Sequence, residues 1–224
     1  FRFTAKAWRR FTHDEADSVD DADVGSYRTG IEPLMEAGRL GAVLLQYPWS
    51  FRRTDANRRR LGATVEALDA YPLAVEVRHD SWLCDDFLEG LRARGIAFCN
   101  IDQPEHGHGI GATAHATGGL GYVRLHGRNQ KAWFNDSLPS YERYNYLYDA
   151  DELRPWVDRI ESIRAQAEDT YVVTNNHYQG KAVANAIEIL SGLGRRLRAL
   201  PDELLAAYPR LRALMADGAG VGGA

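Results

Sequence analysis

The sequence has little cysteine and no long apolar run. Only two cysteines occur in 224 residues, and Cys84 and Cys99 lack the Cys-x-x-Cys spacing of a metal or redox pair. This excludes a disulfide scaffold and favours two buried thiols in a reducing compartment, with a single disulfide left as the alternative. No apolar run approaches the roughly 18 residues of a membrane span, and the first residues do not resemble a signal peptide. We therefore predict a cytoplasmic protein with no membrane partner.

Positive charge does not dominate the chain either. The 27 Lys and Arg are outnumbered by 31 Asp and Glu, which gives a formal net charge of −4. The whole surface is therefore not expected to attract nucleic acid, so a nucleic-acid partner is possible but not favoured. The 45% of hydrophobic residues are enough for one soluble domain with a substantial core.

Short apolar strands alternate with amphipathic helical stretches along the chain. One helical stretch carries Leu61, Val65 and Leu68 at positions i, i+4 and i+7. Strand–helix repetition with short connections predicts parallel strands joined by right-handed crossovers. The expected strands are Phe1–Lys6, Gly41–Gln46, Leu73–Arg78, Ile96–Asp102, Gly121–His126 and Thr170–Asn175.

Six such units fit a doubly wound open sheet or most of an eight-stranded barrel. Along the third strand Val75 alternates with Glu76 and Arg78, so one face is apolar and the other polar. The apolar face suits a layer of helices, and the polar face suits a barrel interior with a site at its mouth. This favours an α/β protein with a partial (β/α) barrel over residues 1–200, followed by a helical extension and flexible tail over residues 201–224. The open sheet remains the alternative.

Three other motifs carry less information. Gly107–Ala112 has the spelling of a dinucleotide-binding loop, but no helical pattern follows it and no acidic residue ends the next strand. His106, His108 and His115 could bind zinc, but we interpret their glycine-rich segment as a loop over the barrel mouth and assign no metal site. The acidic stretch Asp14–Asp23 is interpreted as a solvated loop.

Chemically useful side chains gather where the expected strands end. In a barrel these ends form one ring around one pocket, where this fold places its chemistry. Glu76, Asp102 and His126 can transfer protons and are the predicted catalytic residues. Arg78 and Arg124 supply fixed positive charge for an anion. The other predicted substrate-binding residues are Lys6, His13, Gln46, His79, Asn175, Asn176 and His177.

A purely structural role for this ring is the simplest alternative. Buried charges must be paired, and Glu76 with Arg78, or Asp102 with Arg124, would satisfy that requirement without any substrate. The segment Asn175–Gly180 opens the last helix, whose free N–H groups could hold an anion. We therefore predict a small anionic ligand, phosphorylated or carboxylated.

Several stretches in order along the chain resemble the YecE-like family, also called domain of unknown function 72. They are Phe1–Lys6 with Thr12-His13, Leu40-Gly41, Gln46–Pro48 with Phe51, Val75–Trp82, Tyr122–Gly127, and Asn175–His177 with Gly180, Ala182, Asn185 and Ala186. The resemblance implies a TIM-type barrel in which the strands here are the third to the eighth of eight. We accordingly expect the sequence to be a fragment that lacks the first two strands at its N-terminus.

The resemblance brings no established reaction. The family's barrel is similar to the metal-dependent barrels of endonuclease IV and sugar isomerases, so the alternative function is a metal-dependent hydrolase or nuclease. A non-catalytic binding protein is a third alternative. For an enzyme we expect a hydrolase, isomerase or lyase acting on an anionic substrate. No cofactor is assigned, although a divalent metal is possible, and no feature predicts an oligomeric state.

Overall fold

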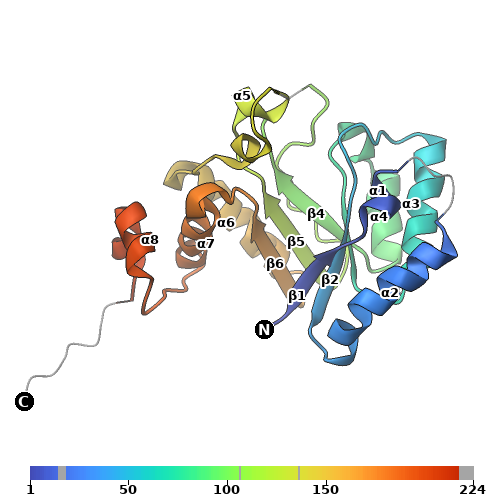
Figure 1. Cartoon of the computed structure of the whole chain (residues 1–224), viewed down its shortest axis with the longest axis horizontal. Coiled ribbons are helices and arrows are strands. Elements are labelled where there is room, and N and C mark those ends of the chain that lie inside the picture. Colours follow the sequence, from blue (N-terminus) through green and yellow to red (C-terminus); the bar gives the residue numbers. More distant parts are fainter. Residues whose placement is uncertain (15–18, 106, 136, 217–224) are drawn as a thin grey trace, which may run out of the picture. The chain divides into compact units, whose positions relative to one another are not determined.

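The computed structural model describes residues 1–14, 19–105, 107–135 and 137–216. Helices and strands alternate along this chain, as the sequence pattern predicts (Figure 1). The strands are β1 (Phe3–Lys6), β2 (Leu40–Gln46), β3 (Leu73–Glu76), β4 (Ala97–Asp102), β5 (Leu120–Leu125) and β6 (Asp169–Thr174). The α-helices are α1 (Arg9–Thr12), α2 (Asp21–Glu36), α3 (Asp55–Ala67), α4 (Asp85–Ala93), α5 (Gln130–Trp133), α6 (Ala150–Arg164), α7 (Lys181–Gly192) and α8 (Asp202–Ala207). Short 3₁₀ helices are η1 (Asp80–Trp82), η2 (Ser140–Tyr144), η3 (Tyr178–Gly180) and η4 (Pro209–Leu214).

The six strands form one parallel sheet in the order β1-β2-β3-β4-β5-β6. All six expected strands are present, but β3, β5 and β6 end before the expected residue. Arg78, His126 and Asn175 therefore lie in the turns that follow the strands. At β3 the physical reason is a competing bond, because the carbonyl of Arg78 accepts from the N–H of Ile110 at 2.9 Å instead of continuing the sheet.

The chain divides into two compact units. The first comprises Phe1–Ile101, His106–Val123 and Gln166–Tyr171, and the second comprises Asp102–Glu105, Arg124–Ala165 and Val172–Ala224. In the first unit α1 to α4 lie along one side of β1 to β3 (Figure 1). The middle of β2 is apolar on both faces and fully buried, as is typical of a parallel strand inside a core.

Within the first unit the amino ends of β1 and β6 approach each other. Arg2 forms an ion pair with Asp169, and the Tyr122 hydroxyl lies 3.0 Å from the Thr4 hydroxyl. A Cβ atom at Gly41 would lie 2.2 Å from the Tyr171 hydroxyl oxygen, so a larger residue would fit β2 at this point only if the Tyr171 side chain moved. The sheet therefore curls, and its first and last strands come together at one end.

In the second unit the C-terminal segment packs against α7. Leu205, Tyr208 and Leu211 form an apolar cluster with Ala184 and Ile187 of that helix. The helical part of the expected extension thus shares a core with α7, and the tail from residue 217 lies outside the described residues. Over the described ranges, each helix is either too short or too polar to cross a membrane.

The acidic stretch begins a helix, so the expectation of a loop is wrong at its end. The Asp20 carboxylate accepts from the N–H groups of Ala22 and Asp23 at 2.7 and 3.3 Å and caps α2. Acidic side chains are favourable in a first turn, where the helix dipole is positive. The remainder of the stretch, residues 15–18, lies outside the described residues, as does His106.

Candidate functional site

The predicted site residues divide between the two units. Those in the first unit lie at the ends of β1, β2 and β3 or in the segments that follow them, and those in the second lie near the ends of β4, β5 and β6 or in the turns that follow. The first group consists of Lys6, His13, Gln46, Glu76, Arg78 and His79, and the second of Asp102, Arg124, His126, Asn175, Asn176 and His177.

Glu76 and Arg78 form the buried ion pair that the structural alternative predicts. The Glu76 side chain is fully buried, and its Oε1 accepts from Nε and Nη2 of Arg78 at 2.9 and 2.8 Å. The Cys99 thiol lies 3.9 Å from the other carboxylate oxygen. Gln46 stands beside Glu76 in the register of β2 and β3. Pairing neutralises the carboxylate and fixes one edge of the guanidinium.

Cationic side chains surround His13, which ends α1. Burial lowers the pKa of this imidazole, and the charges of Arg9, Lys6, Arg78 and Arg60 lower it further. The Thr12 hydroxyl lies 2.8 Å from its Nδ1. Three predicted substrate-binding residues, Lys6, His13 and Arg78, are thereby brought together. We call these three residues with Arg9 and Arg60 the cationic cluster.

Arg60 was not expected in the site, because the arginine-rich run Arg58–Arg60 indicates an exposed face of a helix. Its guanidinium instead lies over the Phe51 ring, with the Cζ atom 5.8 Å from the ring centroid. The Nη2 atom is buried and has no hydrogen-bond partner among the described residues. A buried cationic donor without an acceptor is costly, so an anion at this point would be stabilised. Arg60 directly precedes Leu61 of the buried stripe, the one sequence signal for its position.

His79 follows Arg78 and caps the η1 turn. Its Nδ1 accepts from the N–H of Ser81 at 3.2 Å, and the ring is 6% exposed. The Trp82 indole in the same turn donates to the carbonyl of Phe51 at 2.7 Å. This turn also holds the glycine-rich loop, because His79 bridges Gly109 in antiparallel fashion. The segment Gly107–Ala112, whose glycine spacing matches that of a dinucleotide-binding loop, is therefore part of a loop that packs at the end of β3.

In the second unit Asp102 is surrounded by hydrogen-bond donors. Arg128 donates to both carboxylate oxygens, with Nε 2.9 Å from Oδ2 and Nη2 2.9 Å from Oδ1. The Trp156 indole donates to Oδ1 at 3.1 Å, and the Tyr148 hydroxyl donates to Oδ2. Burial and the neighbouring Asp102 charge raise the pKa of Tyr148, so this hydroxyl remains a donor. The network extends to Glu152, whose Oε1 lies 3.2 Å from Nη1 of Arg128.

His126 is fully buried and is oriented by Asn175. The Asn175 amide nitrogen lies 3.1 Å from Nδ1 of the imidazole and donates to it, which leaves the ring proton on Nε2. The Trp133 ring packs edge-on at 6.2 Å between centroids. Arg124, the other predicted residue on this strand, is also buried. The geometry fixes the tautomer of His126, as a group that transfers protons requires.

The remaining predicted residues belong to the turn before α7. Asn176 is fully buried and donates to the carbonyl of Tyr146 and to Oδ1 of Asn185, both at 2.8 Å. His177 is exposed and lies against the Tyr144 ring at 4.9 Å. Asn176 thus ties the turn to the core of the unit, whereas His177 faces solvent.

Sequence reasoning missed several residues of these networks. Arg60, Tyr148, Glu152 and Trp156 all come from helices or loops whose own pattern indicates only packing or solvent. Tyr148 precedes α6 and Trp156 belongs to it, and both are far along the chain from Asp102, to which they donate.

A family model described as protein of unknown function DUF72 matches residues 1–209. The UPF0759 protein YunF of Bacillus subtilis (strain 168) is 28% identical over 203 residues, which are 85% of this chain and 72% of that protein.

Solved structures with the same fold also carry the DUF72 description. A DUF72 family protein of Thermotoga maritima MSB8 is similar with a TM-score of 0.79 and 34% identity, over 87% of this chain and 74% of that chain. A DUF72 family protein of Enterococcus faecalis V583 gives a TM-score of 0.79 at 24% identity, over 87% and 75% of the two chains. The second likeness shows the fold alone.

Proposed function

The chain belongs to the DUF72 family of proteins of unknown function, and we propose that it is an enzyme that binds a small phosphorylated or carboxylated substrate at the cationic cluster. The observation that carries the proposal is the buried Nη2 atom of Arg60, which has no hydrogen-bond partner among the described residues, together with the positive charges of Lys6, Arg9, Arg60 and Arg78 that act on His13. Glu76 offsets the charge of Arg78, and a bound anion would stabilise the remaining positive charges of the cluster.

His13 is the group in this cluster that can transfer a proton. Its lowered pKa leaves the imidazole neutral at pH 7, and a neutral imidazole accepts protons. Proton transfer to or from a bound anion is a step shared by hydrolases, isomerases and lyases, the classes expected from the sequence. Glu76 holds Arg78 in place for the same anion.

We propose further that the six-stranded sheet is part of a TIM-type barrel. The sequential strand order and the approach of β1 to β6 support this. In such a barrel the carboxyl ends of the strands surround one mouth, where Lys6 and Arg78 would lie. The relatives that match are longer than the matched region, since the alignment covers 74% of the Thermotoga chain.

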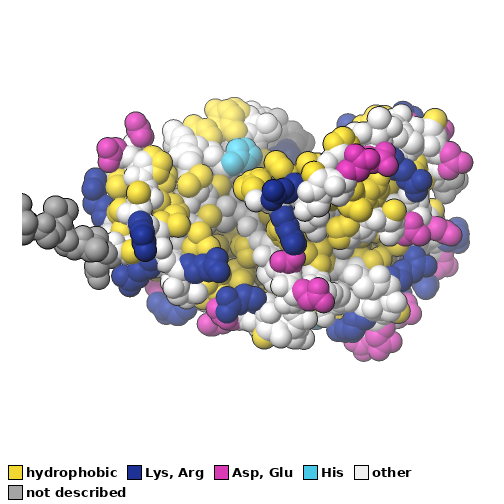
Figure 2. All heavy atoms as spheres, turned by 90° about the horizontal axis from the view of Figure 1, so that it is seen from below, with side chains coloured by type: hydrophobic (Ala, Val, Ile, Leu, Met, Phe, Trp, Pro, Cys, Tyr) yellow, Lys and Arg dark blue, Asp and Glu magenta, His cyan; other side chains and the backbone are white. Residues whose placement is uncertain are grey.

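Nucleic acid is not the favoured substrate. In Figure 2 basic side chains are interspersed with acidic and apolar ones on the face that is drawn. A nuclease that holds a phosphate backbone relies on a continuous basic groove. The cationic cluster is instead a compact group around one imidazole, which suits one small anion.

Lys6→Ala is the first test of the proposed anion site. We expect isothermal titration calorimetry to detect orthophosphate or a member of a panel of small phosphorylated and carboxylated metabolites, and the variant to weaken that binding about tenfold or more. A charge-assisted hydrogen bond contributes about 1.5–3 kcal/mol, and 1.4 kcal/mol is a factor of ten. Lys6 is exposed, so the substitution should leave the fold intact.

Lys131→Ala is the matched control, since it removes an exposed lysine from the other unit. It should bind the same anion with wild-type affinity. Equal binding by wild type and Lys6→Ala, or no binding of any anion in the panel, would remove the basis for the proposal.

The pH dependence of anion binding follows from His13. Its pKa is lowered in the folded chain, so between that value and 6.5 the unfolded chain binds more protons, and stability falls as the pH falls through this interval. A bound anion favours the imidazolium and raises the pKa, so sulfate should bind more tightly as the pH falls through the same interval. Sulfate is the probe because its own charge is constant there. Calorimetry at several pH values measures the effect, and His13→Gln should abolish it.

A further inference from the structure

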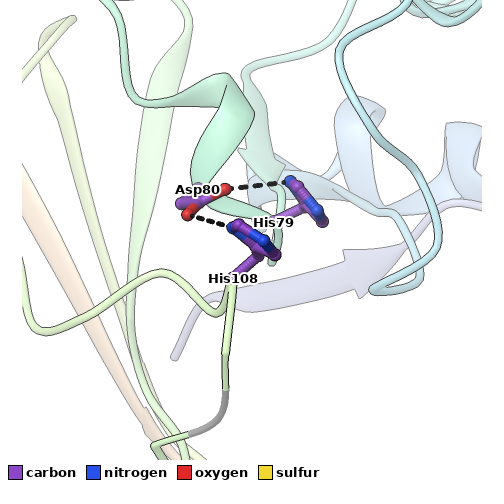
Figure 3. A group of neighbouring side chains, drawn as sticks. All are labelled: His79, Asp80 and His108. Carbon is purple, nitrogen blue, oxygen red and sulfur yellow. Dashed lines mark hydrogen bonds and ion pairs between the residues drawn. The ribbon is translucent and has the colours of Figure 1, made fainter.

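The glycine-rich loop brings His108 to the turn that follows β3. The carbonyl of His108 accepts from the N–H of Asp80 at 2.8 Å, and the bridge between His79 and Gly109 lies beside it. The two imidazole rings stack with centroids 5.4 Å apart and an angle of 17° between their planes. Figure 3 shows both rings directed to the carboxylate of Asp80. Backbone bonds therefore hold two histidines from distant segments around one carboxylate.

The donor atoms of these three side chains are close enough to share one ion. Asp80 Oδ1 lies 3.1 Å from His79 Nδ1, and Oδ2 lies 3.0 Å from His108 Nδ1. One ligand atom from each residue lies within 4.8 Å of the other two. Metal–ligand bonds of about 2.0–2.2 Å at tetrahedral angles place neighbouring ligand atoms roughly 3.3 Å apart. The two separations from Asp80 match this value, and the two imidazole nitrogens lie within 4.8 Å of each other.

His79 already has the tautomer that a metal requires. Because the Ser81 N–H donates to Nδ1 at 3.2 Å and the Ser81 hydroxyl lies 2.9 Å from the same atom, the ring proton lies on Nε2, and the one lone pair of Nδ1 is on the side of Ser81 and Asp80. Nε2 is buried and has no partner among the described residues. Ligation through Nδ1 would displace the Ser81 N–H, which belongs to an exposed residue and can bond to water instead.

The cluster combines a rigid side with an open one. His79 is buried, whereas the His108 side chain is 69% exposed, so an ion can enter from solvent. The Asp80 carboxylate supplies negative charge and accepts a hydrogen bond from Nδ1 of His108 at 3.0 Å, so ligation through that atom requires the ring proton to move to Nε2. Arg52, in the loop that precedes α3, is a cationic side chain that interacts electrostatically with His79.

We infer that His79, Asp80 and His108 form a binding site for one divalent transition-metal ion, with Zn²⁺ as the best match. Two imidazoles and one carboxylate are a common ligand set for zinc, and three protein ligands leave a fourth position for water. Of the three, sequence reasoning placed His79 among substrate-binding residues and did not assign Asp80. The inference is independent of the proposed anion site, because it uses none of the residues of the cationic cluster.

The test measures Zn²⁺ binding to metal-free protein by calorimetry and the bound metal by mass spectrometry. Wild type should bind one equivalent, and Co²⁺ in its place should give visible d–d absorption bands. His108→Ala removes an exposed ligand without touching the core and should weaken Zn²⁺ binding by more than the about 10–100-fold that loss of an outer-shell partner costs. Asp80→Asn should weaken it as well.

His115→Ala is the matched control, because this histidine lies in the same loop but packs its ring against Phe98. It should bind Zn²⁺ like wild type, and so should Lys6→Ala, which separates this inference from the anion site. Absence of a stoichiometric site at micromolar Zn²⁺ would overturn the inference. Unchanged affinity in His108→Ala would do the same, because the ion would then be held elsewhere.

Discussion

Asp102→Asn is expected to lower the free energy of unfolding by about 2–4 kcal/mol, because it deprives the buried donors around this residue and the half-buried Arg128 guanidinium of a charged acceptor. The carboxylate receives two charged hydrogen bonds from Arg128 and one each from Trp156 and Tyr148. An asparagine would present an NH₂ group to donors that need an acceptor. It would also leave Arg128 with Glu152 as its one carboxylate partner in the described part of the chain. Urea denaturation of both proteins measures the difference.

Asp151→Asn is the control, because Asp151 forms an exposed ion pair with Arg154 on α6. Pairs of this kind contribute about 0.3–0.5 kcal/mol, so this variant should unfold almost like wild type. A loss below 1 kcal/mol in Asp102→Asn, with an unchanged denaturant slope, would mean that the network adds little to stability.

The same experiment bears on the predicted catalytic role of Asp102. A carboxylate that accepts from Arg128, Trp156 and Tyr148 has few lone pairs left for a substrate. These contacts suit a structural role in which Asp102 holds Arg128 in place. Through Tyr148, Asp102 also holds the turn at Gly127, because the Tyr148 hydroxyl accepts from the Gly127 N–H at 2.8 Å. A catalytic role for Asp102 stays a prediction. An Asp102→Asn variant that folds and still binds the anion would allow a loss of catalysis to be distinguished from a loss of stability.

The strands could be predicted because buried parallel strands have a simple signature. Runs such as Leu40–Gln46 are short, apolar and bounded by turns, and no helical period competes with them. By contrast, α2 was missed because Val24 and Ile31 are its only fully buried residues. Two apolar positions in sixteen do not make a stripe, and the helix is specified by its Asp20 cap and by tertiary contacts instead.

The candidate site shows the same division between local and distant information. The Glu76–Arg78 pair was predictable because the two residues are two positions apart, at the end of β3 and in the turn that follows it. Such short-range spacing does not indicate Arg60 of α3, whose charge acts on His13. Nor does it indicate His108, which joins Asp80 only because the backbone of a long loop pairs with the η1 turn. Contacts between distant segments depend on packing, which local periodicity does not encode.

Trp82→Ala is expected to destabilise the chain by about 3–5 kcal/mol, the usual cost of truncating a fully buried tryptophan. The indole is 1% exposed, stacks on Phe51 with 5.3 Å between ring centroids and contacts Phe87 at 4.9 Å. Its N–H also satisfies the carbonyl of Phe51, which the substitution would leave without that donor. Asp80 belongs to η1 and His79 caps it, so we expect Trp82→Ala to weaken Zn²⁺ binding at the proposed metal site as well.

Chemical denaturation measures the stability of Trp82→Ala, and Zn²⁺ calorimetry at 10 °C tests the coupling on protein that is still folded. Trp8→Ala is the matched control, since this ring is 41% exposed and makes one edge-on contact with Phe11. It should cost less than about 1 kcal/mol and leave Zn²⁺ affinity unchanged. If Trp82→Ala kept wild-type Zn²⁺ affinity, the η1 turn would hold His79 and Asp80 by its backbone hydrogen bonds alone, and the tryptophan would serve only the core.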